Sequence, residues 1–315
     1  MIVTLLMMIG GDFACLVSRE MRVETGAGQH IAAVIEHSRE SAPENPVVVL
    51  IAGAGPDDRF YWIPSGDLLS PAYETLARQL IGDGYTVVRF DERGVGRSSG
   101  SYRQSATTET LAADVRALVR HVRRETKDTN RPIILAGHSE GAVIAALVAA
   151  GSEDVAAVVL LSAPAVTGAD VIAYQHRYRV ADASQWPSHY TMRQRDSVLV
   201  TEDLHRRETE GWYRFFLSYD PMSAYRSLRQ PVLLLHGERD WQVPVDQARA
   251  IADTLRARGS NDVTLVVIQN ADHVFREDTR ERAFGMGVPE QLSRWMGSRF
   301  VVRQPVQCNT ERREQ

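Results

Sequence analysis

Short apolar runs alternate with amphipathic stretches along most of the chain. The apolar runs are five to seven residues long and rich in Val, Ile and Leu, which is typical of strands buried on both faces of a sheet. They span residues 46–51, 85–90, 132–136, 155–161, 231–235 and 263–268. Stretches with apolar residues at helical spacing follow them, at 71–82, 108–125, 142–150, 245–258 and 288–300. This alternation predicts an α/β fold with a mostly parallel central sheet and helices on both faces.

Two further features complete the predicted organisation. Residues 21–24 and 31–35 flank Gly26-Ala27-Gly28, which predicts a hairpin at a sheet edge. Residues 166–228 interrupt the rhythm and are rich in Arg, Tyr, Trp and His, so we expect a helical cap inserted above the carboxyl edge of the sheet. The predicted parts are an N-terminal extension, a core in two pieces, the cap and a polar tail, at 1–18, 19–165 with 229–303, 166–228 and 304–315.

The pentapeptide Gly137-His138-Ser139-Glu140-Gly141 lies between an apolar run and a helical stretch. A serine on such a tight turn exposes its hydroxyl above the sheet, and the flanking glycines remove Cβ atoms that would clash. The N–H of Glu140 starts a helix, whose positive end favours an oxyanion. The sequence therefore predicts a nucleophile elbow at Ser139. The alternative is a plain strand–helix connection with an incidental serine.

A serine nucleophile needs a base and an orienting carboxylate, which come later in the chain in this topology, the acid first. Asp240 follows the run 231–235 and is the expected acid, with Glu238 as its rival. His273 follows the last strand and is the expected base. His138 precedes the nucleophile on the strand side, so we interpret it as a packed side chain that shapes the elbow.

An oxyanion needs two backbone donors. Glu140 supplies one, and the glycine-rich loop at 52–56 is expected to supply the other from Ala54. The segment 91–98 contains glycines, but their spacing fits a phosphate-binding loop poorly. We expect a rigid loop there, with Asp91 and Arg93 paired locally.

Composition narrows the function further. The chain has 315 residues, 44% of them hydrophobic and 24% charged, with a formal net charge of −4. No basic tract stands out, so nucleic acid is not an expected partner. Lys127 is the single lysine, which argues against Schiff-base chemistry. Cys15 and Cys308 lack metal-ligand spacing, and we expect two free thiols, with a disulfide as the alternative.

The amino terminus is apolar from Ile2 to Ile9, but no basic residue precedes Arg19. A secretory signal carries positive charge before its apolar stretch, so we expect an extension and a cytoplasmic protein, with export as the alternative. No other run reaches the roughly 18 apolar residues that span a bilayer, so no stable membrane association is expected. Nothing in the sequence indicates an oligomeric state.

The motifs together resemble the α/β-hydrolase superfamily over about residues 20–300. Within it the chain is similar to bacterial esterases and serine-aminopeptidase-like hydrolases with G-H-S-E-G. The matching segments are 52–56, 91–98, 137–141, 219–221, 231–240 and 271–273. The resemblance implies a Ser139–Asp240–His273 triad, no cofactor or metal, and hydrolysis of small carboxylic esters. An aminopeptidase or acyltransferase on the same triad, and a non-catalytic binding protein, remain alternatives. Ala52 replaces the histidine usual before the oxyanion glycine.

Aromatic residues of the cap and of the acid loop are the candidate substrate pocket. They either line an acyl pocket or hold the cap to the core, and both interpretations stay open. They are Trp186, Tyr190, Trp212, Tyr213, Phe216 and Trp241.

Overall fold

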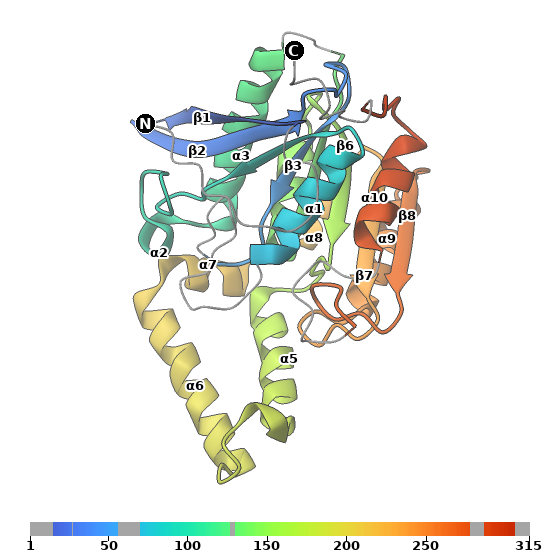
Figure 1. Ribbon diagram of the computed structural model, residues 1–315. Helices are drawn as coiled ribbons and strands as arrows, with labels where there is room; N and C mark the ends of the chain where they lie inside the picture. Colours follow the sequence, from blue (N-terminus) through green and yellow to red (C-terminus); the bar gives the residue numbers. More distant parts are fainter. Residues whose placement is uncertain (1–14, 27, 56–69, 127–129, 278–286, 306–315) are drawn as a thin grey trace, which may run out of the picture.

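The computed structural model describes residues 15–26, 28–55, 70–126, 130–277 and 287–305. An eight-stranded sheet runs through the centre, with helices on both sides of it (Figure 1). The strands are β1 (Leu16–Gly26), β2 (Gln29–Ser38), β3 (Val47–Ile51), β4 (Thr86–Phe90), β5 (Ile133–His138), β6 (Val155–Leu161), β7 (Val232–Gly237) and β8 (Val263–Ile268).

The strand order is β1-β2-β4-β3-β5-β6-β7-β8. β1 pairs antiparallel with β2, and β2 pairs antiparallel with β4. All later pairs are parallel, for example β3 with β5 from Val47↔Ile133 to Ile51↔Gly137. The mostly parallel sheet and the edge hairpin predicted from the apolar pattern are therefore confirmed.

Each face of the sheet buries its own hydrophobic core. On one face lie α1 (Ser70–Gly82) and α10 (Val288–Gly297), which contribute Leu76, Leu80, Leu292 and Trp295. On the other lie α3 (Thr108–Thr126), α4 (Glu140–Ala149) and α9 (Asp246–Ala257). Because β3 packs under both layers, all five of its residues are buried, as a continuous apolar run predicts.

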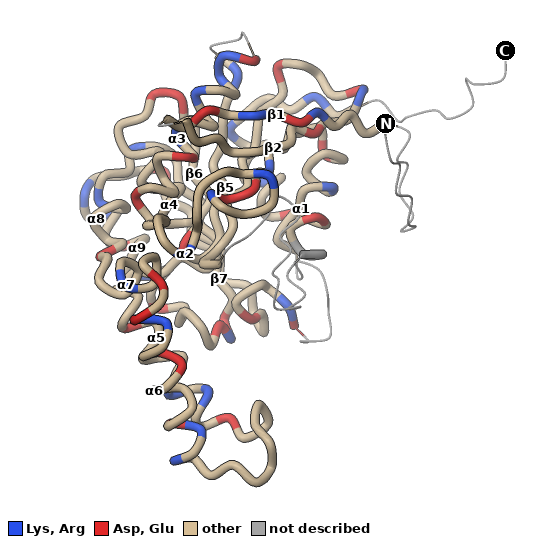
Figure 2. The backbone as a smooth tube through the Cα atoms, turned by 90° about the vertical axis from the view of Figure 1, so that its left-hand side faces the viewer, with Lys and Arg blue, Asp and Glu red and all other residues tan. Residues whose placement is uncertain are grey.

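The cap segment, residues 166–228, consists of helices between β6 and β7. They are α5 (Gly168–Ala181), the 3-10 turn η2 (Ala183–Gln185), α6 (Met192–Thr209), α7 (Gly211–Ser218) and α8 (Met222–Tyr225). α5 and α6 form an arm that projects from the core, whereas α7 and α8 lie against it (Figure 1). Residues of both charge signs are interspersed along the arm (Figure 2). Its α6 begins at Thr191, whose side chain forms a capping box with Gln194.

Three expectations need correction. β1 starts at Leu16, inside the range predicted for an N-terminal extension. Cys15 is disulfide-bonded, not a free thiol; the one other cysteine, Cys308, lies outside the described residues.

The third concerns Arg93, which pairs with Asp114 of α3 through two 2.7 Å bonds, not with Asp91. Asp91 instead accepts the backbone N–H of Arg97 at 2.8 Å. Local sequence spacing suggested the Asp91 pair, but the fold brings α3 closer to the guanidinium. Within the described ranges, no helix is both long and apolar enough to cross a membrane.

Candidate active site

Ser139 occupies a strained turn between the last residue of β5 and the first of α4. Its backbone has φ 54° and ψ −120°, a conformation that costs energy for any residue with a Cβ. The turn is possible because its flanking residues are glycines. A Cβ on Gly137 would lie 2.0 Å from the carbonyl oxygen of Gly141, and one on Gly141 would lie 2.1 Å from that of Ala52. The local geometry is that of the predicted elbow.

His273 and Asp240 form a buried pair at the carboxyl edge of the sheet. His273 Nδ1 lies 2.7 Å from Asp240 Oδ2, and the two residues are 6% and 5% exposed. The other carboxylate oxygen accepts the backbone N–H groups of Gln242 and Val243. Glu238, the rival acid, is exposed and accepts the N–H of Asn270 at 3.1 Å. The fold therefore brings Asp240, and not Glu238, to the histidine.

A second histidine contacts the same carboxylate. His236 Nε2 lies 2.8 Å from the carbonyl oxygen of Val243 and 3.2 Å from Asp240 Oδ2. Burial of Asp240 would raise its pKa, but the facing His273 and His236 rings outweigh burial and hold the pKa below its usual range. Asp240 is therefore ionised at neutral pH. The sequence analysis missed His236, although its place at the end of β7 beside Asp240 is a usable signal.

Two side chains, those of Ser162 and His138, contact the backbone carbonyl group of His273. Its carbonyl oxygen accepts Ser162 Oγ at 2.8 Å and lies 2.9 Å from His138 Nε2. Tyr73 Oη lies 2.6 Å from the other ring nitrogen, His138 Nδ1. Burial and the nearby His273 lower the pKa of His138 to about 3, so its ring is neutral. A neutral ring that donates from Nε2 and accepts at Nδ1 satisfies all these contacts.

His138 thus links Ser139 to the base. It precedes Ser139 in the chain, and its ring centroid lies 4.7 Å from that of His273. The structure agrees with its interpretation as a packed side chain and adds a partner. Ser162, directly after β6, is a further residue that the sequence analysis missed. Its position after a parallel strand was the signal that could have found it.

The predicted oxyanion donors lie on either side of the elbow. Glu140 is the first residue of α4, and the first N–H groups of a helix have no acceptor within it. A Cβ on Gly53 would lie 3.3 Å from Ser139 Cβ, so the loop after β3 approaches the nucleophile closely. Ala54 follows Gly53 and is exposed, while the N–H of Gly55 donates to Tyr102 Oη at 3.1 Å.

The side chain of Glu140 is buried away from solvent. Its Oε1 accepts Thr108 Oγ1 at 2.7 Å, and both carboxyl oxygens accept Trp212 Nε1, at 3.2 and 3.1 Å. Burial raises the pKa of Glu140 to about 7. The hydrogen bonds from Thr108 and Trp212 lower the pKa, but their effect is smaller than that of burial. The sequence analysis assigned only the backbone of this residue and missed the carboxyl.

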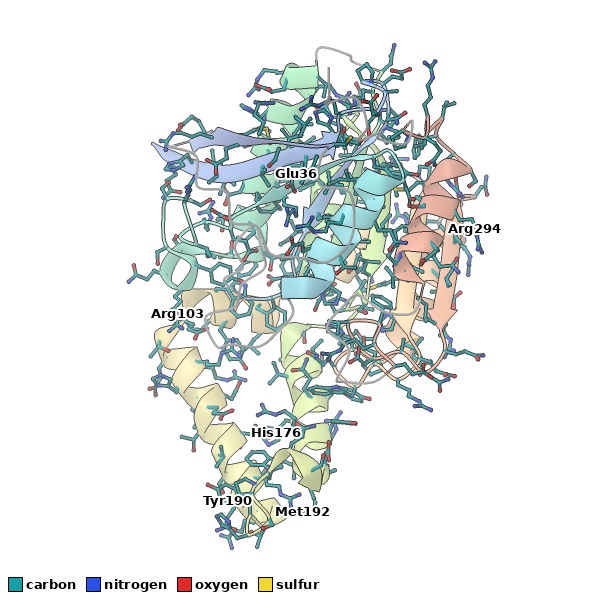
Figure 3. The ribbon with its side chains drawn as sticks, in the orientation of Figure 1. Glu36, Arg103, His176, Tyr190, Met192 and Arg294 are labelled. Atoms are coloured by element: carbon teal, nitrogen blue, oxygen red, sulfur yellow. The ribbon has the colours of Figure 1, made fainter. Side chains whose placement is uncertain are left out.

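The candidate pocket aromatics separate into two groups. Tyr190 lies at the far end of the arm (Figure 3), and Trp186 stacks against it with ring centroids 6.0 Å apart. The structure does not bring these two to Ser139, because the arm projects from the core. Trp212 and Phe216 stack 5.3 Å apart on the elbow side, where Trp212 contacts Glu140.

The remaining two aromatics make contacts that hold the cap segment. Tyr213 is buried and donates to Asp203 Oδ1 at 2.5 Å. Trp241, beside Asp240, stacks on Tyr178 of α5 with ring centroids 5.0 Å apart. For Tyr213 the contacts fit the interpretation as a structural residue. Trp241 joins the acid loop to helix α5 of the arm.

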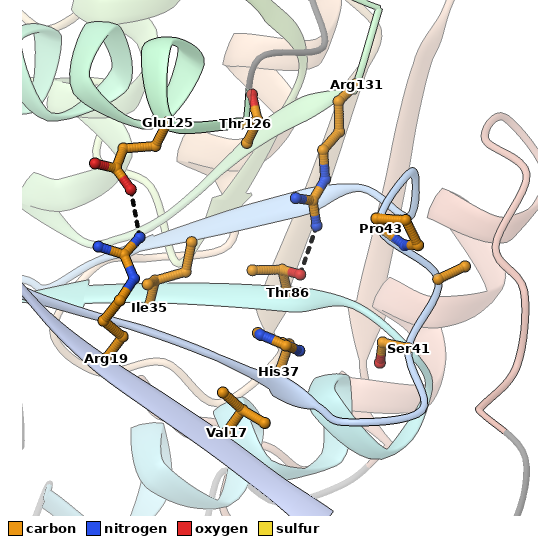
Figure 4. Close-up of a pocket in the computed structure, with 11 residues that line it drawn as sticks. Val17, Arg19, Ile35, His37, Ser41, Pro43, Thr86, Glu125, Thr126 and Arg131 are labelled. Carbon is orange, nitrogen blue, oxygen red and sulfur yellow. Dashed lines mark hydrogen bonds and ion pairs between the residues drawn. The ribbon is translucent and has the colours of Figure 1, made fainter.

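A cavity of about 270 Å³ lies elsewhere, beside the edge hairpin (Figure 4). Its lining includes Thr86 and Arg131, which stand at the amino ends of β4 and β5, whereas Ser139 follows the carboxyl end of β5. Arg131 donates to Thr86 Oγ1, and Arg19 pairs with Glu125 across the same cavity. The cavity is therefore separate from the Ser139 site, and its arginines are engaged by Glu125 and Thr86.

Across the described ranges, no group of three or more His, Cys, Asp or Glu residues could hold a metal ion. The candidate site combines a serine on a strained turn, a buried histidine–carboxylate pair and the backbone N–H of Glu140 at the start of a helix. Such a set can activate a hydroxyl and stabilise an oxyanion.

The chain is similar to known hydrolases. Residues 69–280 match the model of the hydrolase family described as serine aminopeptidase, S33. The chain is 23% identical to esterase EstD of Thermotoga maritima over 270 residues. The matching region covers 80% of this chain and 62% of EstD.

Solved structures share the fold. An esterase of Pyrococcus furiosus, Pf2001, superposes with a TM-score of 0.66 at 17% identity, covering 92% of this chain and 95% of that one. Est1E of Butyrivibrio proteoclasticus, with ferulic acid bound, superposes with a TM-score of 0.58 at 18% identity, covering 88% and 98%.

Proposed function

Since the chain belongs to the serine aminopeptidase S33 family of α/β hydrolases, we propose that it is a serine hydrolase that cleaves small carboxylic esters through an acyl-enzyme. One observation carries the proposal. The buried His273–Asp240 pair, joined at 2.7 Å, contacts His138, the residue directly before a serine on a strained strand–helix turn. A histidine with an orienting carboxylate next to such a serine is the arrangement that activates a hydroxyl.

In the proposed reaction Ser139 Oγ attacks the ester carbonyl carbon while His273 Nε2 takes the hydroxyl proton. Asp240 holds Nδ1–H and stabilises the imidazolium that forms. The tetrahedral intermediate collapses as His273 returns the proton to the leaving alcohol. Water then attacks the acyl-enzyme by the same route and releases the carboxylic acid.

The negative oxygen of each intermediate is bound by the backbone N–H groups of Ala54 and Glu140. The close approach of Gly53 to Ser139 supports the first assignment, and the position of Glu140 at the start of α4 supports the second. No cofactor or metal has a role in these steps. The substrate is a small molecule.

An aminopeptidase on the same triad is the second candidate, because the matching family model carries that description. Such an enzyme needs a free carboxylate to bind the substrate amino group. The buried Glu140 carboxyl is occupied by Thr108 and Trp212, and Asp203 by Arg207 and Tyr213. The esterases among its relatives favour the first candidate.

The test combines covalent labelling with a substrate panel. A fluorophosphonate probe should label the parent and the control Ser197→Ala, a change at an exposed cap serine, but not Ser139→Ala. Removing the nucleophile should lower kcat for p-nitrophenyl esters by about 10⁴-fold or more. Faster turnover of aminoacyl-anilides than of esters would instead select the aminopeptidase. Labelling of Ser139→Ala at the parental rate would reject the proposed nucleophile.

A further inference from the structure

The proposed chemistry uses only the backbone N–H of Glu140, yet its side chain joins three parts of the fold. Glu140 begins α4 directly after Ser139 and is 2% exposed. Its carboxyl accepts hydrogen bonds from Thr108, at the start of α3, and from Trp212, in α7 of the cap segment. These partners lie 32 residues before and 72 residues after it in the chain. A single carboxyl therefore connects the elbow to the core helix α3 and to the cap.

The Trp212 indole that holds the carboxyl is itself fixed on several sides. Its ring packs against Tyr102 at 5.6 Å and Phe216 at 5.3 Å, and the Arg206 guanidinium lies 5.7 Å from its centroid. A rigid indole leaves its N–H aimed at Glu140. The position of the carboxyl is therefore set by the packing of α7 against the core.

The surroundings of the carboxyl are otherwise apolar. A small cavity of about 20 Å³ adjoins it, lined also by Val143 of α4 and by cap-segment residues such as Phe216 and Tyr219. Of the described residues in that lining, only Tyr219 besides Glu140 is titratable, and none is a cation. An acid buried without a cation costs stability, which the two hydrogen bonds offset in part. An apolar side chain at this position would avoid that cost. We therefore expect the carboxyl to serve another purpose, which is to fix the position of the elbow through its hydrogen bonds.

We propose that the Glu140 carboxyl is a positioning residue that locks the elbow to α3 and to cap helix α7. One peptide unit joins Ser139 to Glu140 and contains the Glu140 N–H. When two separate helices hold the Glu140 side chain, they therefore fix the orientation of this N–H and of the Ser139 hydroxyl next to it. The base of the cap and the oxyanion donor then move as one body. This inference rests on the proposed function, since it assumes that Ser139 is the nucleophile.

A pair of nearly isosteric substitutions separates the roles of shape and hydrogen bonding. Glu140→Met keeps the length of the side chain but removes both acceptors. Glu140→Gln keeps Oε1, the oxygen that both Thr108 and Trp212 reach. Because sub-ångström placement governs turnover, we expect kcat for an ester to fall about 10- to 100-fold in Glu140→Met with KM little changed. Glu140→Gln should recover most of that loss.

A triple variant guards against a loss of folding. Thr108→Val, Glu140→Met and Trp212→Phe together leave no unpaired polar group, so the thermal midpoint should return toward the parental value while kcat stays low. Trp295→Phe is the matched control, since Trp295 Nε1 donates to Thr264 Oγ1 at 3.1 Å on the opposite face of the sheet. It should keep parental kinetics.

The readouts are kcat, KM, the thermal midpoint and the rate of fluorophosphonate labelling. A folded triple variant with parental kcat, or Glu140→Gln as impaired as Glu140→Met, would overturn the positioning role. A parent that neither labels nor hydrolyses esters would instead reject the proposed function. These two failures are distinguishable because the second concerns the parent alone.

Discussion

His273 Nδ1 and Asp240 Oδ2 lie 2.7 Å apart, although the two residues come from loops after different strands, β8 and β7. The strands are neighbours, paired in parallel up to Gly237↔Ile268, so their carboxyl ends deliver both loops to one place. Asp240 is held by two backbone N–H groups, and His273 by bonds to its carbonyl oxygen. The pair is fixed before any substrate arrives, as an orienting carboxylate requires.

Replacing Asp240 should therefore damage turnover far more than replacing Glu238. In Asp240→Asn the amide can donate to His273 Nδ1 and select the wrong tautomer, which costs up to about 10⁴-fold in kcat. Glu238→Gln changes an exposed side chain bonded to the N–H of Asn270 and should stay within about threefold of the parent. Steady-state ester hydrolysis measures both. The reverse order of damage would move the acid to Glu238.

Gly141 should tolerate no side chain. A Cβ there would lie 2.1 Å from the carbonyl oxygen of Ala52 and 2.5 Å from that of Ile51, both backbone atoms. We expect Gly141→Ala to destabilise the fold by about 3 kcal/mol or more, because β3 or the elbow must shift. Gly297→Ala is the control, since a Cβ at Gly297 in α10 meets nothing within 4 Å.

Denaturant unfolding of the two variants provides the measurement. Gly297→Ala should be neutral or more stable by up to about 1 kcal/mol, as alanine favours a helix over glycine. Equal midpoints for the two variants would contradict this prediction, because they would mean that the elbow accommodates a Cβ at Gly141.

The central strands were predictable because they are short, apolar and buried on both faces, and the edge strand β8 because it is a short apolar run of intermediate exposure. The run 155–161 coincides with β6, and 263–268 with β8, since each ends where polar residues begin. For the cap the sequence predicted helices but not their bounds, because α6 is largely exposed and buries only Arg195 and Leu199. Without a core to face, an apolar period does not develop. Its helical state comes from local features such as the Thr191 capping box.

Chain order and strand ends indicated Ser139, Asp240 and His273, since each follows a predicted parallel strand. The residues that hold them were missed because their contacts are long-range. Thr108 meets Glu140, and Ser162 meets His273, only when the sheet and its helices assemble. Sequence spacing also could not tell Trp186, at the tip of the arm, from Trp212, at its base.

The buried Glu140 carboxyl should make stability depend on pH. Burial raises its pKa from its ordinary value of 4.5 to about 7, so between these values the folded chain holds a proton that the unfolded chain has released. The stability of the parent relative to Glu140→Gln should therefore be highest below about pH 4.5. This stability difference should fall by on the order of 3 kcal/mol as pH rises to about 7, and then level off.

Urea unfolding of both proteins at a series of pH values from 4.5 to 8.5 tests this. The other carboxylates are common to the two chains, so their contributions cancel in the difference. A difference that is constant over the whole range would show that the Glu140 carboxyl has an ordinary pKa in the folded protein.

Phe216 should influence the choice of acyl chain, whereas Trp186 should not. Phe216 stacks on Trp212 beside the elbow and lines the small cavity next to Glu140, while Trp186 lies at the end of the arm. In Phe216→Ala the added space should favour longer acyl groups. Contacts of this kind discriminate by only about 1–3 kcal/mol, so kcat/KM should shift gradually across a series from acetate to decanoate.

Trp186→Ala is the matched control because it removes an aromatic ring of the same cap segment. The indole N–H of Trp186 donates to the carbonyl oxygen of Arg179, and its ring stacks on Tyr190. Both contacts lie within the arm. Its chain-length profile should follow the parent. If Phe216→Ala also keeps the parental profile, the acyl group does not reach the base of the cap, and Phe216 has a packing role. If Trp186→Ala shifts the profile instead, the arm must fold over Ser139 when substrate binds.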